Sequence, residues 1–88
     1  MKYIIFKHGT LFHPVLFSDH TTHSQVKLEG ATPISAGFVS FSETLRLPKC
    51  YGNSTSLKLE SRGELDEEII RRFQLNSGTS SFIDYESI

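Results

Sequence analysis

The sequence predicts an α+β protein, in which a small, mainly antiparallel β-sheet of four to five strands packs on one main α-helix. Short runs rich in β-branched, leucine and aromatic residues recur along residues 2–61, separated by turns that contain glycine or proline. One amphipathic helical pattern follows them and ends near Asn76. Because 88 residues leave no room for a second core, we predict one domain over residues 1–78 and a C-terminal tail over 79–88.

The first two strands are predicted at residues 2–6 and 11–17, where the runs KYIIF and LFHPVLF flank a short turn. Gly9 in that turn can take the positive φ that a tight hairpin requires. Pro14 cannot donate a ladder hydrogen bond, which favours a sheet edge for the second strand. Apolar residues occupy successive positions in both strands, so we expect both faces of this hairpin to be covered.

Two further strands are predicted at residues 33–41 and 44–51. Gly37 indicates a bulge or the close approach of another backbone, and Pro48 indicates a second edge strand. With both proline-containing strands at edges, the expected strand order is 2-1-3-4. In the fourth strand, alternation is expected to place three residues on one face: Leu45, Leu47 and Tyr51.

Two shorter elements are expected between and after these strands. The polar run 18–26 predicts a short helical turn, for which Ser18 and Asp19 are the possible caps. The run SLKLES at 56–61 predicts a short strand or extended arm.

The helix is predicted to begin at Ser61, because Ser61 and Glu64 match the Ser-x-x-Glu capping box. The acidic residues 66–68 then fall in the first turns, and Arg71 and Arg72 fall in the last, as the helix dipole favours. We expect an apolar stripe to face the sheet, formed by Leu65, Ile69 and Phe73.

The net charge is small, at −1, although it is unevenly distributed. Residues 1–59 hold six Lys/Arg against three Asp/Glu, and residues 60–88 hold three against seven. Neither half has the dense basic stripe of a nucleic-acid-binding protein, so we expect no nucleic-acid partner. No stretch resembles a signal peptide or the roughly 20 apolar residues of a membrane span. With its single cysteine, the chain is expected to be cytoplasmic, without membrane association.

All four histidines lie between residues 8 and 24, in the pattern H-x₄-H-x₆-H-x₂-H. Paired zinc-binding histidines are usually three to five residues apart, and structural sites usually add cysteines. A hairpin that carries solvated imidazoles explains the same pattern, so no metal or other cofactor is predicted. If a metal were bound, its candidate ligands would be His13, His20 and His23.

The segment YGNSTSLKLESRG (51–63) is rich in small side chains that donate hydrogen bonds, and it leads into the predicted helix. Helix N-termini attract anions through their free N–H groups and their dipole. An anion or nucleotide could therefore be held by Ser54, Ser56, Ser61 and Arg62. The segment is neither a Walker-type loop nor a dinucleotide fingerprint, and a turn followed by a helix cap explains the same residues.

Three segments carry a resemblance: HSQV (23–26), PISAGFVSF (33–41) and YGNSTSLKLESRGELDEEII (51–70). They are similar to segments of small uncharacterised proteins that are encoded by bacteriophages and prophages. Those proteins begin with a short β-hairpin, carry a Ser-Ala-Gly-Phe-like strand and end in a Ser-Leu-x-Leu-x-Ser-Arg segment before a helix. The resemblance covers most of residues 1–73 and implies a phage or prophage origin and a bacterial host cell, but no activity. Extra length in GATPISAGF and after Asn76 departs from that pattern.

We therefore predict a non-enzymatic protein-interaction module, a phage-encoded accessory protein or inhibitor that acts on a host protein. The alternatives are an anion- or nucleotide-binding protein that uses residues 54–62, and a histidine-based metal-binding protein. Cys50 shows no local nucleophile–base signature, so no catalytic residue is predicted. One helix can cover only one sheet face, so the other is expected to be closed by a homodimer. The predicted interface residues are Phe12, Phe82, Ile83 and Tyr85.

Overall fold

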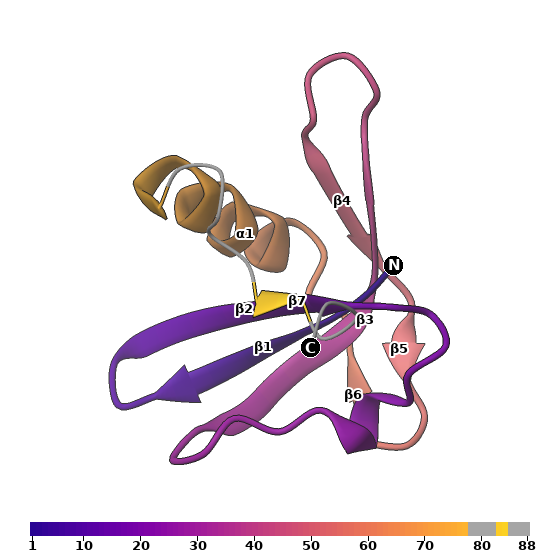
Figure 1. Ribbon diagram of the computed structural model, residues 1–88, viewed down its shortest axis with the longest axis vertical. Helices are drawn as coiled ribbons and strands as arrows, with labels where there is room; N and C mark the ends of the chain where they lie inside the picture. Colours follow the sequence, from indigo (N-terminus) through magenta and orange to yellow (C-terminus); the bar gives the residue numbers. More distant parts are fainter. Residues whose placement is uncertain (78–82, 85–88) are drawn as a thin grey trace.

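The computed structural model describes residues 1–77 and 83–84, and places a β-sheet between one helix and a layer of loops and short strands (Figure 1). Four antiparallel strands make up most of the sheet: β1 (Lys2–His8), β2 (Leu11–Phe17), β3 (Thr32–Phe41) and β4 (Pro48–Tyr51). The helix α1 spans Glu64–Ser77. The shorter elements are the 3₁₀ turn η1 (His23–Gln25), β5 (Asn53–Ser54), β6 (Leu59–Glu60) and β7 (Ile83–Asp84). The predicted α+β class is confirmed.

The strand order of the main sheet is β4-β3-β1-β2-β7, so its antiparallel strands follow the expected order 2-1-3-4. Pro14 and Pro48 both lie on the outer strands of the antiparallel set, where a missing N–H is tolerated. Beyond β2, the strand β7 adds a short parallel pairing at Val15 and Leu16. Gly9 has a φ of +64° in the turn between β1 and β2, as predicted.

In the described part of the chain, β4 forms one edge of the sheet, and its outward-facing backbone donors are already used or missing. Val39 N donates to Met1 O at 2.8 Å. Since Val39 is paired with Cys50, the Cys50 N–H points away from β3. That N–H donates instead to Glu67 Oε2 of α1 at 2.9 Å. Pro48, two residues earlier on the same edge, has no N–H to offer.

The helix α1 covers one face of the sheet, but not with the predicted stripe. Ile69 and Phe73 are half-buried, whereas Leu65 is 63% exposed. Among the helix residues whose burial the structure describes (64–74), Asp66 and Ile70 are fully buried, one helical turn apart. The face of α1 that packs on the sheet is therefore not the predicted apolar stripe but a face that includes the Asp66 carboxylate. The core on this side consists of Tyr3, Ile5, Leu16, Val39, Cys50 and Ile70.

The opposite face of the sheet is covered by the chain itself (Figure 1). Residues 18–31, which include η1, and the β5–β6 hairpin lie against it. The buried residues on this side are Ile4, Phe6, Val15, Phe17, Val26 and Ala36. The expectation of an open sheet face was therefore wrong, because it counted only the helix and ignored how much apolar surface loops can cover. The homodimer stays a prediction, but this face is not free to form it.

Gly37 lies where β3 comes close to the chain that follows β4. A Cβ at this position would be 2.5 Å from Tyr51 O and 3.2 Å from Ser61 Cβ. The predicted close approach of another backbone is confirmed, because only glycine leaves room for these atoms.

A β-bulge occurs earlier in β3, at Ile34. Ile5 is opposite Ser35, whereas the next residue, Phe6, is opposite Pro33, so β3 contains one extra residue. Ile34 and Ser35 consequently both face α1, where Ile34 packs on the core and Ser35 bonds to the helix. The bulge turns Pro33 onto the opposite face, where it lines a cavity with Phe6.

Two short predicted elements are shifted along the chain. The helical turn is only the three residues of η1, and Thr22 N donates to Gln25 Oε1 at its start. Ser18 Oγ accepts from His20 N at 3.0 Å, so it stabilises a turn rather than a helix. In the predicted arm 56–61 only β6 is extended, because Lys58 has a φ of +57° within the β5–β6 turn.

Candidate functional site

The hairpin formed by β3 and β4 projects from the rest of the molecule (Figure 1). We call residues 42–47, which connect these strands, the hairpin tip. Leu45 and Leu47 in the tip are 73% and 45% exposed. Arg46 N donates to Ser42 O, Ser42 N donates to Leu47 O, and Leu47 N donates to Ser42 Oγ, each at 3.0 Å. The backbone of the tip is thus fixed by its own hydrogen bonds, and it displays two leucines to solvent.

Arg46 explains why the predicted strand 44–51 is wrong in its first half. Its φ of +56° lies in the left-handed region, which ends an extended strand. Its guanidinium lies over the ring of Phe41, 5.8 Å from the centroid, where cation–π attraction holds it. Leu45 and Leu47 alternate in the sequence as in a strand, but they lie on a turn.

A buried polar cluster joins the start of α1 to the sheet, and its centre is Asp66, which is fully buried. Asp66 Oδ2 accepts hydrogen bonds from Tyr3 Oη at 2.5 Å and from Arg62 N at 2.9 Å. Asp66 Oδ1 accepts from Ser35 Oγ and from Arg62 Nε, both at 2.9 Å. Four donors therefore compensate the desolvation of one buried carboxylate.

The helix begins at Glu64, so the predicted capping box of Ser61 and Glu64 is not formed. Ser61 Oγ accepts from Gly63 N at 3.0 Å and lies 2.7 Å from Tyr3 Oη. The negative charge that a helix N-terminus attracts is supplied by Asp66, in the first turn of α1. The N-terminal end of α1 thus interacts with a carboxylate of the same chain, that of Asp66.

The predicted anion-binding residues are divided between two places. Ser61 and Arg62 belong to the Asp66 cluster. Ser54 is buried in the β5–β6 hairpin, where its Oγ accepts from Leu57 N. Ser56 is exposed and lines a polar pocket of about 270 Å³. The other lining residues of this polar pocket are Lys2, Thr22, His23, Phe38, Asn53 and Thr55.

The three candidate metal ligands lie in three different elements: His13 in β2, His20 in the following loop and His23 in η1. His23 is buried between Phe17 and Phe38. Both phenyl rings lie edge-on to the imidazole, with ring centroids 5.3 and 6.0 Å from its own. Its Nε2 is 3.0 Å from Gly37 O, and burial lowers the pKa of this imidazole. Among the residues that the structure describes, no three His, Cys, Asp or Glu side chains are grouped to hold a metal ion.

Two buried groups near Asp66 hold their protons at neutral pH. Burial, and to a smaller extent the charge of Asp66, raises the pKa of the Cys50 thiol to about 12. Burial also raises the pKa of Tyr3, as does its hydrogen bond to Asp66. A protonated thiol is a poor nucleophile. The hydrogen bonds of Asp66 connect α1 to the sheet.

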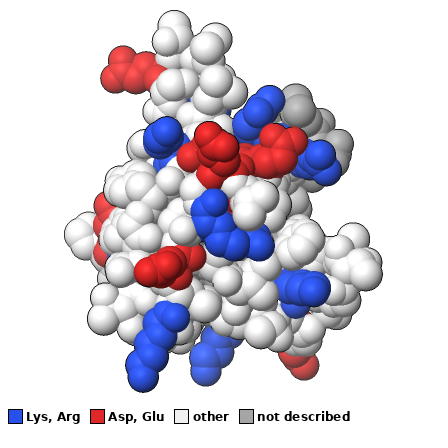
Figure 2. Space-filling model, turned by 180° about the vertical axis from the view of Figure 1, so that it is seen from behind, with Lys and Arg blue, Asp and Glu red and all other residues white. Residues whose placement is uncertain are grey.

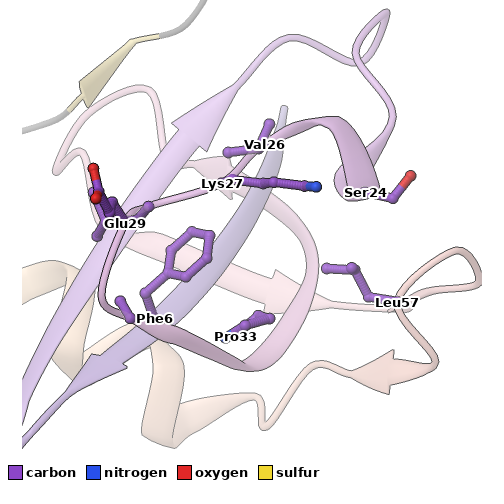
Figure 3. A pocket seen from close by; sticks show the side chains of 9 residues that line it. Phe6, Ser24, Val26, Lys27, Glu29, Pro33 and Leu57 are labelled. Atoms are coloured by element: carbon purple, nitrogen blue, oxygen red, sulfur yellow. The ribbon is translucent and has the colours of Figure 1, made fainter.

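An apolar cavity of about 560 Å³ lies on the sheet face opposite α1 (Figure 3). Six of its nine lining residues are apolar. Sequence reasoning missed this cavity, because its residues come from four separate segments and share no spacing. The lining residues are Phe6, Ser24, Val26, Lys27, Leu28, Glu29, Ala31, Pro33 and Leu57.

The predicted interface residues are only partly described. Phe12 is 41% exposed, and the guanidinium of Arg62 lies 5.9 Å from its ring centroid. Phe82 and Tyr85 lie outside the described residues. Of Ile83 the structure gives the backbone, which pairs with Val15.

Charged side chains of both signs are interspersed on the face shown in Figure 2. On α1, Glu68 pairs with both Arg71 and Arg72, at 3.5 and 3.0 Å. Within residues 1–77 and 83–84, no helix is long and apolar enough to cross a bilayer.

A scan against models of protein families, a search of curated proteins and a search of solved structures each found no match. The resemblance to phage-encoded proteins therefore stays a prediction.

Proposed function

We propose that this chain is a non-enzymatic protein-binding module whose contact with its partner is centred on the hairpin tip. The observation that supports this proposal is the exposure of Leu45 and Leu47 on a loop fixed by its own hydrogen bonds. Single exposed leucines are common on protein surfaces and need no explanation. Two exposed leucines on one projecting turn offer a partner an apolar contact. Because the turn is already ordered, little conformational entropy is lost when the partner binds.

A charged residue of the tip extends this contact. Arg46 lies between the two leucines in the sequence, and its guanidinium lies over Phe41 at the end of β3, 5.8 Å from the ring centroid. Arginine is enriched among the residues that dominate binding energy at protein interfaces. The proposed partner is a protein with an apolar pocket that accepts the tip. If the predicted phage origin holds, that partner is a protein of the bacterial host.

The test compares two variants in a capture experiment with lysate of the source organism or its host. Leu45→Asp combined with Leu47→Asp places two charges at the proposed contact. Leu65→Asp is the matched control, because Leu65 is 63% exposed on α1, away from the tip. Exposed substitutions change stability by about 0.5 kcal/mol or less, so all three proteins should remain folded.

We expect the wild type and Leu65→Asp to retain the same partner, and the double variant to lose it. A partner that the double variant retains would place the contact elsewhere. If the wild type retained no protein at all, the proposal would be wrong.

The anion-binding alternative has one supporting observation, which is the polar pocket around Lys2. Lys2 and the hydroxyl groups of Thr55 and Ser56 line it together. Its test is given in the Discussion.

A further inference from the structure

The floor of the apolar cavity is shaped by the β3 bulge. In a regular antiparallel ladder, Phe6 would be opposite Ile34, since Ile5 is opposite Ser35. The extra residue places Pro33 opposite Phe6 instead, and both side chains face the cavity (Figure 3). The floor is therefore part of the sheet, where Phe6 belongs to the buried core.

The walls come from residues 24–31, which begin within η1 and cross the sheet, and from Leu57 in the β5–β6 turn (Figure 3). Val26 and Phe6 are only 4% and 2% exposed, so core packing fixes them from behind. The polar lining residues all belong to the same crossing segment: Ser24, Lys27 and Glu29.

The size and lining of the cavity indicate what it can hold. Its volume of about 560 Å³ falls within the range of roughly 300–1,000 Å³ that is typical of small-molecule sites. Apolar walls offer water few hydrogen-bond partners, so displacing water by an apolar group is favourable. Lys27 and Glu29 bring opposite charges to the lining, which gives no preference for a charged ligand.

We infer that this cavity is a binding site for a small, uncharged organic molecule, whose apolar ring or chain packs against Phe6, Val26 and Leu57. A polar group of the ligand would lie toward Ser24. The inference is independent of the proposed function, because the cavity shares no residue with the hairpin tip.

The test uses N-phenyl-1-naphthylamine, an uncharged fluorescent probe of matching chemistry. We expect its emission to rise saturably with one site per wild-type chain, and probe–protein NOEs to involve Phe6 and Val26. Leu57→Trp should fill the cavity and weaken probe binding at least tenfold. Leu65→Trp adds the same indole at an exposed helix position and should leave binding unchanged. The chain contains no other tryptophan, so a blue-shifted emission in Leu57→Trp reports an indole inside the cavity.

Ala31→Phe is the second variant, because it fills the same cavity from residues 24–31 if Leu57→Trp does not fold. We expect Ala31→Phe to weaken probe binding as well, with an unchanged circular dichroism spectrum. The inference is overturned if the wild type binds no probe saturably, or if the NOEs lie elsewhere. It is also overturned if a folded cavity-filling variant binds the probe as tightly as the wild type.

Discussion

Tyr3 in β1 donates a 2.5 Å hydrogen bond to Asp66 in the first turn of α1, across 63 positions of the sequence. Through this bond and the one from Ser35 Oγ, a single carboxylate connects two central strands to the helix. Burying a charge requires that its hydrogen bonds be complete, so the cluster fixes how α1 sits on the sheet.

Asp66→Asn tests this cluster with almost no change in side-chain volume. The amide nitrogen would face donors that now point at a carboxylate oxygen, and the charge that Arg62 compensates would be lost. We expect the free energy of unfolding to fall by about 3–5 kcal/mol, as when other buried charge pairs are broken. Tyr3→Phe removes one donor only and should cost about 1.5–3 kcal/mol. Urea unfolding followed by circular dichroism measures both, and a fully stable Asp66→Asn variant would contradict this account.

Arg62→Ala distinguishes a structural arginine from an anion-binding one. Its Nε bonds to Asp66 Oδ1, but the side chain is one-third exposed, which weakens the pair. We expect a loss of about 1–2 kcal/mol in unfolding free energy. An anion site at Ser61 and Arg62 predicts the opposite, an unliganded fold as stable as the wild type with a lost response to phosphate.

Gly37→Ala should be destabilising although alanine is among the smallest residues. Its Cβ would lie 2.5 Å from Tyr51 O, so β3 and the chain after β4 must move apart. We expect a loss of about 1–3 kcal/mol, the usual cost of overpacking. Ser40→Ala, at an exposed position of the same strand, serves as the control and should change stability by about 0.5 kcal/mol or less. Equal melting temperatures for the two variants would show that this close approach is not real.

The raised pKa of Cys50 predicts a loss of stability at alkaline pH. Burial raises this pKa from 9.0 to about 12, so between these values the unfolded chain releases a proton that the folded chain keeps. The free energy of unfolding therefore falls as pH rises above 9, and Tyr3, whose pKa is also raised, adds to the fall above pH 10. We expect the melting temperature to decrease steadily over this range, and Cys50→Ala to flatten the part between pH 9 and 10. At pH 8, iodoacetamide should alkylate the buried Cys50 much more slowly than a free cysteine. Reaction at the free-cysteine rate would mean that the thiol is accessible.

The anion-binding alternative makes its prediction at the polar pocket. Lys2 Nζ donates to Thr21 O at 2.9 Å, which positions the ammonium group beside the pocket. Inorganic phosphate at ten times its dissociation constant should then stabilise the wild type by about 1.4 kcal/mol, seen as a higher melting temperature. Lys2→Met should remove this shift, and Lys7→Met, an exposed control at the far end of β1, should keep it. Without a shift in the wild type, the alternative can be discarded.

The sequence was most informative where a single glycine or proline restricts what the backbone can do at its position. Gly9 marked the first turn, and Pro14 and Pro48 identified the outer antiparallel strands and thus their order. It was least informative about Asp66, because an acidic residue in a first helical turn is normally solvated and favoured by the dipole. Its burial depends on Tyr3 and Ser35, which are distant in sequence and carry no spacing signal.

Candidate-site residues were predictable only in part, for a similar reason. Leu45 and Leu47 follow a strand pattern, and nothing in their spacing shows that Arg46 adopts a positive φ between them. The apolar cavity depends on the Ile34 bulge and on the path of residues 24–31, which are properties of the assembled fold.

The outer edge of β4, which offers no free N–H at Pro48 or Cys50, also affects how copies of this chain behave at high concentration. An exposed strand normally offers N–H groups onto which another molecule can add a strand, and this is how fibrils grow. Here Pro48 has no such group, and that of Cys50 is bonded to Glu67. To recruit a neighbour along this edge, the molecule would first have to pull α1 away from β4, so folding itself protects the chain against fibril growth at this edge.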